Sequence, residues 1–297
     1  MTITATPPVG ELLRTWRERR HLSQLAFALE ADVSARHVSF VETGKARPSR
    51  EMLLRMAERL EVPLRDRNQL LLAGGFAPAF PERQLDDPAL REARAIVDRV
   101  LRAHEPYPAL AVDRHWTLLA ANRAVAPLLD GVGERLLRPP INVLRLSLHP
   151  DGMAPRIANR AQWRAHLLDR LRRQVELTAD ETLARLLDEL RDYPNAGLGE
   201  PASTRDAVDV AVPLHLRTEH GPLSLLSTTM VFGTPVDVTL SELAIEAFFP
   251  ADAATAASLA RASHDREDLP APSQRHRQSS DAWSEPDRNR SCPTESG

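Results

Sequence analysis

The chain has 297 residues, of which 42% are hydrophobic and 27% charged, and its formal net charge is −3. This apolar content is enough for folded cores, but no run approaches the roughly 18 apolar residues of a membrane-spanning helix. The only cysteine is Cys292, which excludes a disulfide framework and a cysteine-based zinc cluster. Residues 1–9 lack the charged and apolar regions of a signal peptide, so we expect a cytoplasmic protein.

The charge is divided unequally along the chain, which is long enough for two domains. Residues 1–80 contain twelve Arg or Lys and nine Asp or Glu residues, whereas the remainder contains 26 and 32. A modestly basic first quarter before an acidic remainder fits a DNA reader attached to a partner domain. Lys45 is the only lysine among many arginines. Such a bias is typical of GC-rich coding and favours a bacterial source.

Residues 9–44 carry the pattern of three helices, the last two very short. The first is expected over residues 9–20. Ser23 is a suitable N-cap for a helix over residues 24–31, and Ser34 for another that stops before Gly44. The connector between them is only long enough to turn, which predicts a helix-turn-helix. In that motif the helix after the turn enters the major groove, and the helix before the turn lies across the phosphate backbone. The alternative is an αα-corner of an unrelated helical domain.

Two further helices complete the predicted first domain. Ser49 caps the fourth helix, and its apolar residues recur on one face. Pro63 separates it from a fifth helix over residues 64–73, which ends at Gly74-Gly75. The sequence therefore predicts a flexible leader over residues 1–8 and an all-α, five-helix domain over residues 9–75.

The first domain resembles the Xre/Cro-repressor type of helix-turn-helix between residues 10 and 62. The matching positions are Gly10, Leu13, Trp16, Arg17, Leu22, Ser23, Gln24, Phe27, Ala28, Val33, Ser34, Val38, Glu42, Gly44, Pro48, Ser49, Leu53, Ala57, Leu60 and Val62. Asp32 and His21 depart from the pattern, since glycines usually stand at these turns. Asp tolerates a left-handed backbone better than most residues, so the turn at Asp32 is expected to be kept. The resemblance also implies that Arg17 and Glu42 pair inside the domain.

The candidate DNA contacts follow from the motif and the resemblance. Base-contacting positions are implied for Ala35, Arg36 and Phe40; Arg36 can take a guanine in bidentate fashion, and Phe40 can press on a thymine methyl group. Further candidates near the groove or the phosphates are Gln24, Ser34, His37, Ser39, Lys45 and Arg47. For Lys45 and Arg47 a merely solvated basic loop is the alternative. One such helix covers few base pairs, so we expect a homodimer on two half-sites.

Residues 76–105 are predicted to form a proline-containing linker and a connecting amphipathic helix. After residue 106 the pattern changes to an α+β domain with an antiparallel sheet. Strands are expected over residues 108–112, 116–121, 208–217, 223–232 and 243–249. Helices are expected over residues 122–129, 154–177, 182–193 and 251–262, with an apolar segment over 141–148 and a loop over 194–207. Residues 263–297 read as a disordered tail.

Residues 106–254 are similar to the MmyB-like ligand-binding domain, on the combination of several short motifs. These motifs are Tyr107-Pro108-Ala109-Leu110, Leu119-Ala120-Ala121-Asn122-Arg123-Ala124, Asn142-Val143-Leu144-Arg145, His149-Pro150-Asp151-Gly152, Phe232-Gly233-Thr234-Pro235 and Phe248-Phe249-Pro250. The resemblance implies a PAS-like fold over residues 106–262 and a small ligand, apolar or fatty-acid-like. Trp116, Asn122 and Trp163 are candidates to line the pocket, although core packing is the alternative for the tryptophans.

No enzyme motif accompanies this pattern, and we expect no catalytic residues, metal or cofactor. Metal-binding histidine spacing, a nucleophile elbow and a phosphate-binding glycine loop are all missing. His149 and Asp151 flank a proline and are expected to form a turn. The sequence favours a nucleoid-associated, sequence-specific transcription regulator controlled by a small molecule. The alternatives are a DNA-tethered enzyme acting on a small hydrophobic substrate, and a regulator whose second domain only dimerises.

Overall fold

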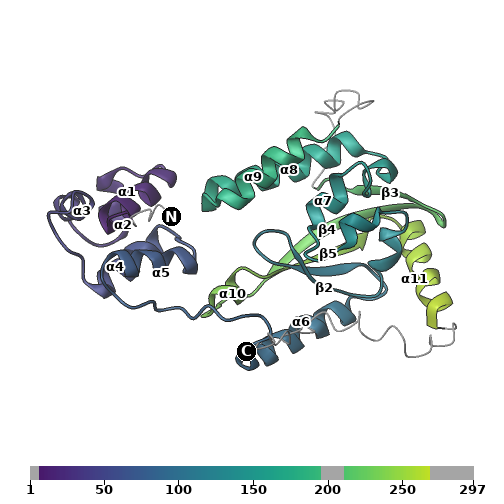
Figure 1. Ribbon diagram of the computed structural model, residues 1–297, viewed down its shortest axis with the longest axis horizontal. Coiled ribbons are helices and arrows are strands. Elements are labelled where there is room, and N and C mark those ends of the chain that lie inside the picture. Colours follow the sequence, from purple (N-terminus) through teal and green to yellow (C-terminus); the bar gives the residue numbers. More distant parts are fainter. Residues whose placement is uncertain (1–6, 195–210, 268–297) are drawn as a thin grey trace, which may run out of the picture.

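The computed structural model describes residues 7–194 and 211–267. Most of the predicted leader, nearly all of the predicted loop over 194–207, the beginning of the strand expected from residue 208 and the tail beyond residue 267 lie outside the described residues. Figure 1 shows a helical N-terminal domain beside a larger domain built around a curled antiparallel sheet. The predicted fold class, a multidomain chain with an all-α five-helix domain and an α+β PAS-like domain, is confirmed.

The N-terminal domain, which we call the reader, begins where Pro8 precedes the first helix. Its helices are α1 (Val9–Arg19), α2 (Gln24–Glu30), α3 (Ala35–Glu42), α4 (Arg50–Arg59) and α5 (Leu64–Ala73). The predicted caps are confirmed, because the hydroxyls of Ser23, Ser34 and Ser49 accept hydrogen bonds from backbone N–H groups three residues later. The chain thus starts each of these helices at a serine whose side chain replaces a missing helical partner.

Residues with a left-handed backbone conformation form turns between the helices of the reader. His21 (φ 55°), Asp32 (φ 53°) and Gly44 (φ 72°) all have positive φ. His21 and Asp32 therefore keep the backbone conformation for which a glycine is usual. Gly10 meets a different need: a Cβ there would lie 2.2 Å from the backbone oxygen of Val41. Helix α1 thus packs directly on the backbone at the end of α3.

The larger domain contains a sheet whose strands, among the described residues, run in the order β2-β1-β5-β4-β3, all antiparallel. The strands are β1 (Ala109–Val112), β2 (Leu118–Ala121), β3 (Leu214–Thr218), β4 (Gly221–Val231) and β5 (Ala244–Pro250). The connecting helix α6 (Arg91–Ala103), which follows the turn η1 (Pro88–Leu90), covers one face of the sheet. Its buried Val97 and Leu101 pack against alternate residues of β1 and β5.

The opposite face carries the larger core of the second domain. The remaining helices and turns are η2 (Ala126–Leu129), η3 (Glu134–Leu137), α7 (Val143–Leu148), η4 (Ala154–Arg156), α8 (Arg160–Thr178), α9 (Glu181–Asp192), α10 (Val238–Ser241) and α11 (Ala253–Glu267). Helices α8 and α9 lie together across the sheet from α6 (Figure 1). This face is the one on which a cavity remains.

Several expected elements differ from the structure. The helix expected over residues 154–177 is interrupted, because Ile157 bridges to Leu216 and Ala158 donates to the backbone of His215. Within the described residues the strand expected over 208–217 begins only at Leu214. The helix expected over 122–129 is a short 3-10 turn. Helix α11 runs to Glu267, past the expected end at residue 262 and into the predicted tail.

Candidate DNA-binding face and ligand cavity

Helix α3 presents a small cationic face around Phe40. Arg36 is exposed, and its guanidinium lies over the Phe40 ring with the Cζ atom 5.1 Å from the ring centroid. The ammonium of Lys45 lies 5.9 Å from the same centroid. Cations within about 6 Å of an aromatic face are attracted to it. Phe40 therefore holds the charges of Arg36, on α3, and of Lys45, just after α3, on the same part of the reader surface.

The other candidate DNA contacts have mixed surroundings. Ser34 is exposed but accepts the capping bond from the His37 backbone, 3.1 Å long. The His37 ring contacts the Met52 sulfur, with 3.0 Å between Nε2 and Sδ. Ala35 is partly buried against the reader core, and Ser39 is half-buried. Arg47 is exposed in the loop after α3.

Gln24 and Arg17 meet at the carboxylate of Glu42. Arg17 donates to Glu42 from Nε (2.6 Å to Oε1) and Nη2 (3.0 Å to Oε2), as the family resemblance implied. Gln24 Nε2 donates to Oε2 over 2.8 Å. The hydrogen bond to Glu42 raises the pKa of Arg17. This cluster ties α1 and α2 to the last turn of α3, which makes Glu42 structural and leaves Gln24 with one amide hydrogen already committed.

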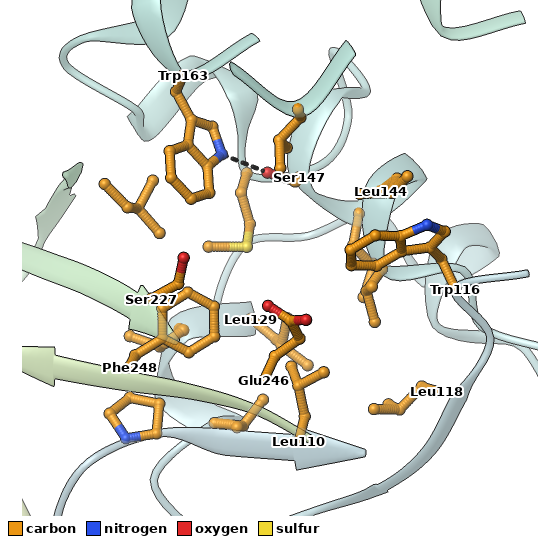
Figure 2. Close-up of a pocket in the computed structure, with 18 of the residues that line it drawn as sticks. Leu110, Trp116, Leu118, Leu129, Leu144, Ser147, Trp163, Ser227, Glu246 and Phe248 are labelled. Carbon is orange, nitrogen blue, oxygen red and sulfur yellow. Dashed lines mark hydrogen bonds between the residues drawn. The ribbon is translucent and has the colours of Figure 1, made fainter. Parts of the chain in front are cut away.

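The second domain contains an apolar cavity of about 90 Å³ between its sheet and α7 and α8. The lining residues include Leu110, Trp116, Leu118, Leu129, Leu144, Ser147, Trp163, Ser227, Glu246 and Phe248, which Figure 2 labels. Most of this wall is aliphatic or aromatic. Such a cavity suits an apolar ligand, with the few polar groups setting its orientation.

Both candidate tryptophans line the cavity, whereas Asn122 does not. Trp163 Nε1 donates to Ser147 Oγ (2.9 Å), and Trp116 Nε1 donates to Gln174 Oε1 (2.9 Å). Asn122 lies apart from the cavity and is buried. Its Oδ1 accepts from the Ala109 backbone, and its Nδ2 donates to two backbone carbonyls. Its position thus differs from the expected one because its amide satisfies backbone groups between α6 and the sheet.

Sequence reasoning missed the polar residues at the cavity. Glu246 points from β5 into the cavity, and Arg170 of α8 holds it through two hydrogen bonds of 2.6 and 3.0 Å. Arg170 also lies over the Trp116 ring, 4.5 Å from Cζ to the centroid. A charged residue within the apolar run over 243–249 was the available signal, since a strand rarely buries a carboxylate without a partner.

The side chains of His149, Asp151, His215 and His220 do not line the cavity. The turn expected at His149 and Asp151 is present, and Arg135 donates to the Asp151 carboxylate over 2.5 Å. His220 is exposed, and His215 is half-buried. Within residues 7–194 and 211–267, no three His, Cys, Asp or Glu side chains lie close enough together to hold a metal ion.

Charged residues join the reader to the second domain. Arg65 of α5 donates to Glu242, which follows α10, over 2.8 and 2.9 Å, and it also pairs with Glu82 of the linker. Arg114, in the turn between β1 and β2, lies 3.6 Å from the Glu242 carboxylate. Nearby on α5, burial raises the pKa of Asp66 to about 6, with Arg114 opposing the rise.

The turn between β1 and β2 also contacts the cavity. His115 lies 2.8 Å from Asp180, the N-cap of α9, and Arg114 lies 3.4 Å from the same carboxylate. The next residue, Trp116, lines the cavity and has a left-handed backbone (φ 66°). A bulky side chain in that region is uncommon and strained. Three consecutive residues thus connect the interdomain contact, α9 and the cavity wall.

Two family models match this chain. The helix-turn-helix model matches residues 13–66, and the model of the MmyB-like transcription regulator ligand binding domain matches residues 93–262. Together they define a DNA-binding transcription regulator with a ligand-binding domain. The second match spans more than half of the chain, which therefore belongs to the family of MmyB-like transcription regulators. The matched models describe a regulator and not an enzyme family.

Other comparisons add little. No curated protein matches the chain. A solved structure described as an RNA-binding light-oxygen-voltage receptor is 12% identical; the match covers 88% of this chain and 64% of that one, with a TM-score of 0.24. A TM-score of this size does not show a shared fold. Among the described helices, none combines the length and the apolar character needed to cross a membrane.

Proposed function

We propose that the chain is a sequence-specific regulator whose reader binds operator DNA as a homodimer, and whose cavity binds a small apolar ligand with an acyl or fatty-acid-like chain. The observation that carries this proposal is the combination of an exposed cationic face on α3 with an apolar cavity in the second domain. We further propose a cytoplasmic, nucleoid-associated protein of a bacterium. Its reader would span residues 9–75 and its ligand-binding domain residues 106–262.

Arg36 is the proposed base-reading residue. Its guanidinium is exposed and is oriented by Phe40 on the helix that enters the groove. An arginine that contacts guanine in bidentate fashion contributes about 1–3 kcal/mol of discrimination. Ala35, Ser39, His37 and Phe40 would lie around it, with Ser34, Gln24, Lys45 and Arg47 toward the phosphates.

The ligand signal is proposed to reach the reader through the turn at residues 114–116. Trp116 lines the cavity, His115 contacts the start of α9, and Arg114 lies beside the carboxylate that holds Arg65 of the reader. A ligand shifts such an equilibrium only if it binds one arrangement better than the other. Trp116, in the cavity wall, would sense the ligand, and Arg114, two residues before it, would pass the change to the contact between Glu242 and Arg65 of the reader.

Selection of operators from random duplex DNA tests the reader proposal. The purified full chain should enrich a sequence with two related half-sites. Arg36→Ala should lose the preference at one base position in each half-site, while Arg99→Ala, at an exposed arginine of α6, should select the wild-type sequence. If no sequence is enriched at low salt, the proposal that α3 recognises a specific DNA sequence is wrong.

The ligand half of the proposal has its own test. The operator titration is repeated with and without a medium-chain alcohol. The alcohol should change the affinity of the protein for operator DNA. If the alcohol binds the protein without any effect on DNA affinity, control of DNA binding by the ligand is wrong. If the alcohol does not bind at all, a second domain that serves only for dimerisation becomes the better account. Consumption of the added compound would instead favour an enzyme.

A further inference from the structure

The polar end of the cavity is built around one buried carboxylate. Glu246 lies on β5 at a position whose side chain faces the cavity, and that side chain is only 5% exposed. Figure 2 shows the carboxylate directed away from Leu110, toward the middle of the side chains that line the cavity. A charge in such a place requires specific partners, because burial removes its hydration.

The hydrogen-bond partners of Glu246 within the described residues do not use its full hydrogen-bonding capacity. Oε1 accepts from Arg170 Nη2 (2.6 Å) and from Thr229 Oγ1 (3.0 Å). Oε2 accepts from Arg170 Nη1 (3.0 Å). A carboxylate has about four lone-pair positions. Within the described part of the chain, Oε2 therefore keeps one acceptor position for a donor that enters the cavity.

Glu246 already balances the charge of Arg170, although two of the five guanidinium N–H groups make no hydrogen bond within the described residues. Its guanidinium donates twice to Glu246 and once to Thr229 (2.8 Å), and it lies over the Trp116 ring. It is also the only cation among the described residues that line the cavity. A carboxylate placed beside it would approach Glu246 in an apolar site, where like charges repel strongly.

Two hydroxyl groups complete the polar lining. Ser147 Oγ already accepts from Trp163, so its own O–H remains a donor. Within the described residues the Ser227 side chain makes no hydrogen bond, and in Figure 2 its hydroxyl points toward the cavity. Both hydroxyls can donate to an uncharged oxygen, such as that of an amide or an ester.

We propose that the cavity selects an uncharged ligand, an apolar chain ending in a hydrogen-bond donor such as a hydroxyl or a primary amide, and rejects the free carboxylate. The donor binds Oε2 of Glu246, whose charge Arg170 already balances. This inference rests on the proposed function, since it names the end group of the ligand that the same cavity takes.

Titration of the full chain with four eight-carbon probes tests the inference. The probes are octanol, octanamide, methyl octanoate and octanoate at about pH 8, where the acid is ionised, with binding followed by calorimetry. Octanol and octanamide should bind at least about tenfold more tightly than octanoate, because hydrogen bonds to charged groups have this magnitude. Methyl octanoate, which lacks a donor, should bind more weakly than octanol.

The outcomes separate the two proposals. Octanoate binding as tightly as octanol overturns the end-group inference and leaves the apolar cavity intact. Methyl octanoate binding as tightly as octanol overturns the donor contact with Glu246. Absence of binding by all four probes overturns the ligand proposal together with the inference.

Glu246→Gln provides the sharpest variant. Removing the carboxylate charge leaves the Arg170 guanidinium without its anion, so octanoate should gain at least about tenfold relative to octanol. Glu189→Gln is the matched control, because Glu189 also holds an arginine by two hydrogen bonds (2.7 and 2.8 Å to Arg145) but does not line the cavity. An unchanged probe ranking in Glu246→Gln overturns the inference. If that variant does not fold, the wild-type probe series decides alone.

Discussion

Two arginine–glutamate pairs of similar geometry lie in different surroundings in the two domains. In the reader, Arg17 and Glu42 are surrounded by packed side chains, and Gln24 occupies a further acceptor position of Glu42. In the ligand-binding domain, Arg170 and Glu246 have side chains 27% and 5% exposed and border a cavity. The side chains of the first pair are 9% and 3% exposed and lie within the reader, whereas the second pair has one side toward the cavity.

This difference indicates what each pair contributes. A buried ion pair surrounded by protein fixes the relative positions of the elements that carry it, because breaking it leaves an uncompensated charge. A pair that borders a cavity can satisfy a lost partner with water or a ligand. The reader is therefore expected to be rigid around Glu42, and the ligand-binding domain to be responsive around Glu246.

Breaking the enclosed pair should have the largest effect. Among the described residues, Arg17→Met leaves Glu42, 3% exposed, with Gln24 as its one remaining side-chain donor, and should lower the free energy of unfolding by about 3–5 kcal/mol. Urea denaturation measures this loss, and DNA binding should fall with it. Arg14→Met is the control, because Arg14 and Glu18 form a pair exposed to water, which screens the attraction between the two charges. Equal losses in the two variants would contradict the comparison.

The same substitution at the open pair should cost less. Arg170→Met leaves Glu246 beside a cavity that admits water, so we expect a loss of about 2–3 kcal/mol. Arg145→Met, which breaks a pair whose side chains are 42% and 37% exposed, should cost about 1 kcal/mol or less. The comparison fails if Arg170→Met destabilises the protein more than Arg17→Met does.

The stability of the protein should depend on pH through Asp66, which lies near the contact between the two domains. Because the folded state holds a proton on Asp66 up to about pH 6, its contribution to stability is greatest in acid and is lost as the pH rises from about 4 through 6. Asp66→Asn should therefore stabilise the protein by about 1–2 kcal/mol at pH 8, with a smaller gain at pH 4. Urea denaturation at several pH values measures this, and Asp86→Asn, at an exposed position of the linker, is the control. A gain independent of pH would exclude Asp66 titration as its cause.

The smallest effect is expected on the DNA side. Lys45→Ala removes an exposed cation beside Phe40 and should weaken binding to all sequences alike, lowering the salt slope by about one unit. Binding isotherms at several salt concentrations give this slope. Arg138→Ala, at an exposed arginine of the second domain, should leave the slope unchanged. A sequence-dependent loss in Lys45→Ala would make Lys45 a base contact.

Local chemistry allowed much of the reader to be predicted. A serine before a short apolar pattern is sufficient to place a helix start, and Asp32 and His21 kept the left-handed turns despite lacking a glycine. The Arg17–Glu42 pair was accessible only through the family resemblance, because 25 residues separate the partners. The hairpin of β3 and β4 was predictable from alternation and a short polar turn.

The second domain shows where such reasoning stops. The expected long helix is interrupted because Ile157 pairs with Leu216, a contact between residues far apart that periodicity does not encode. Arg170 and Glu246 are 76 residues apart, so neither predicts the other. Asn122 is a polar residue in a ligand-binding domain, yet backbone groups occupy its amide. In each case a contact between residues distant in the sequence decided the outcome.

The absence of a side chain at Gly10 has a consequence for any response of this regulator. Because α1 rests on the carbonyl groups at the end of α3, α3 has no room to slide or roll against α1. An effector that acts through α5 must therefore displace the reader as a whole. In a homodimer, that displacement alters the separation and angle of the two readers. The effector would then change the number of base pairs preferred between the two half-sites, and the bases recognised within each half-site would stay the same.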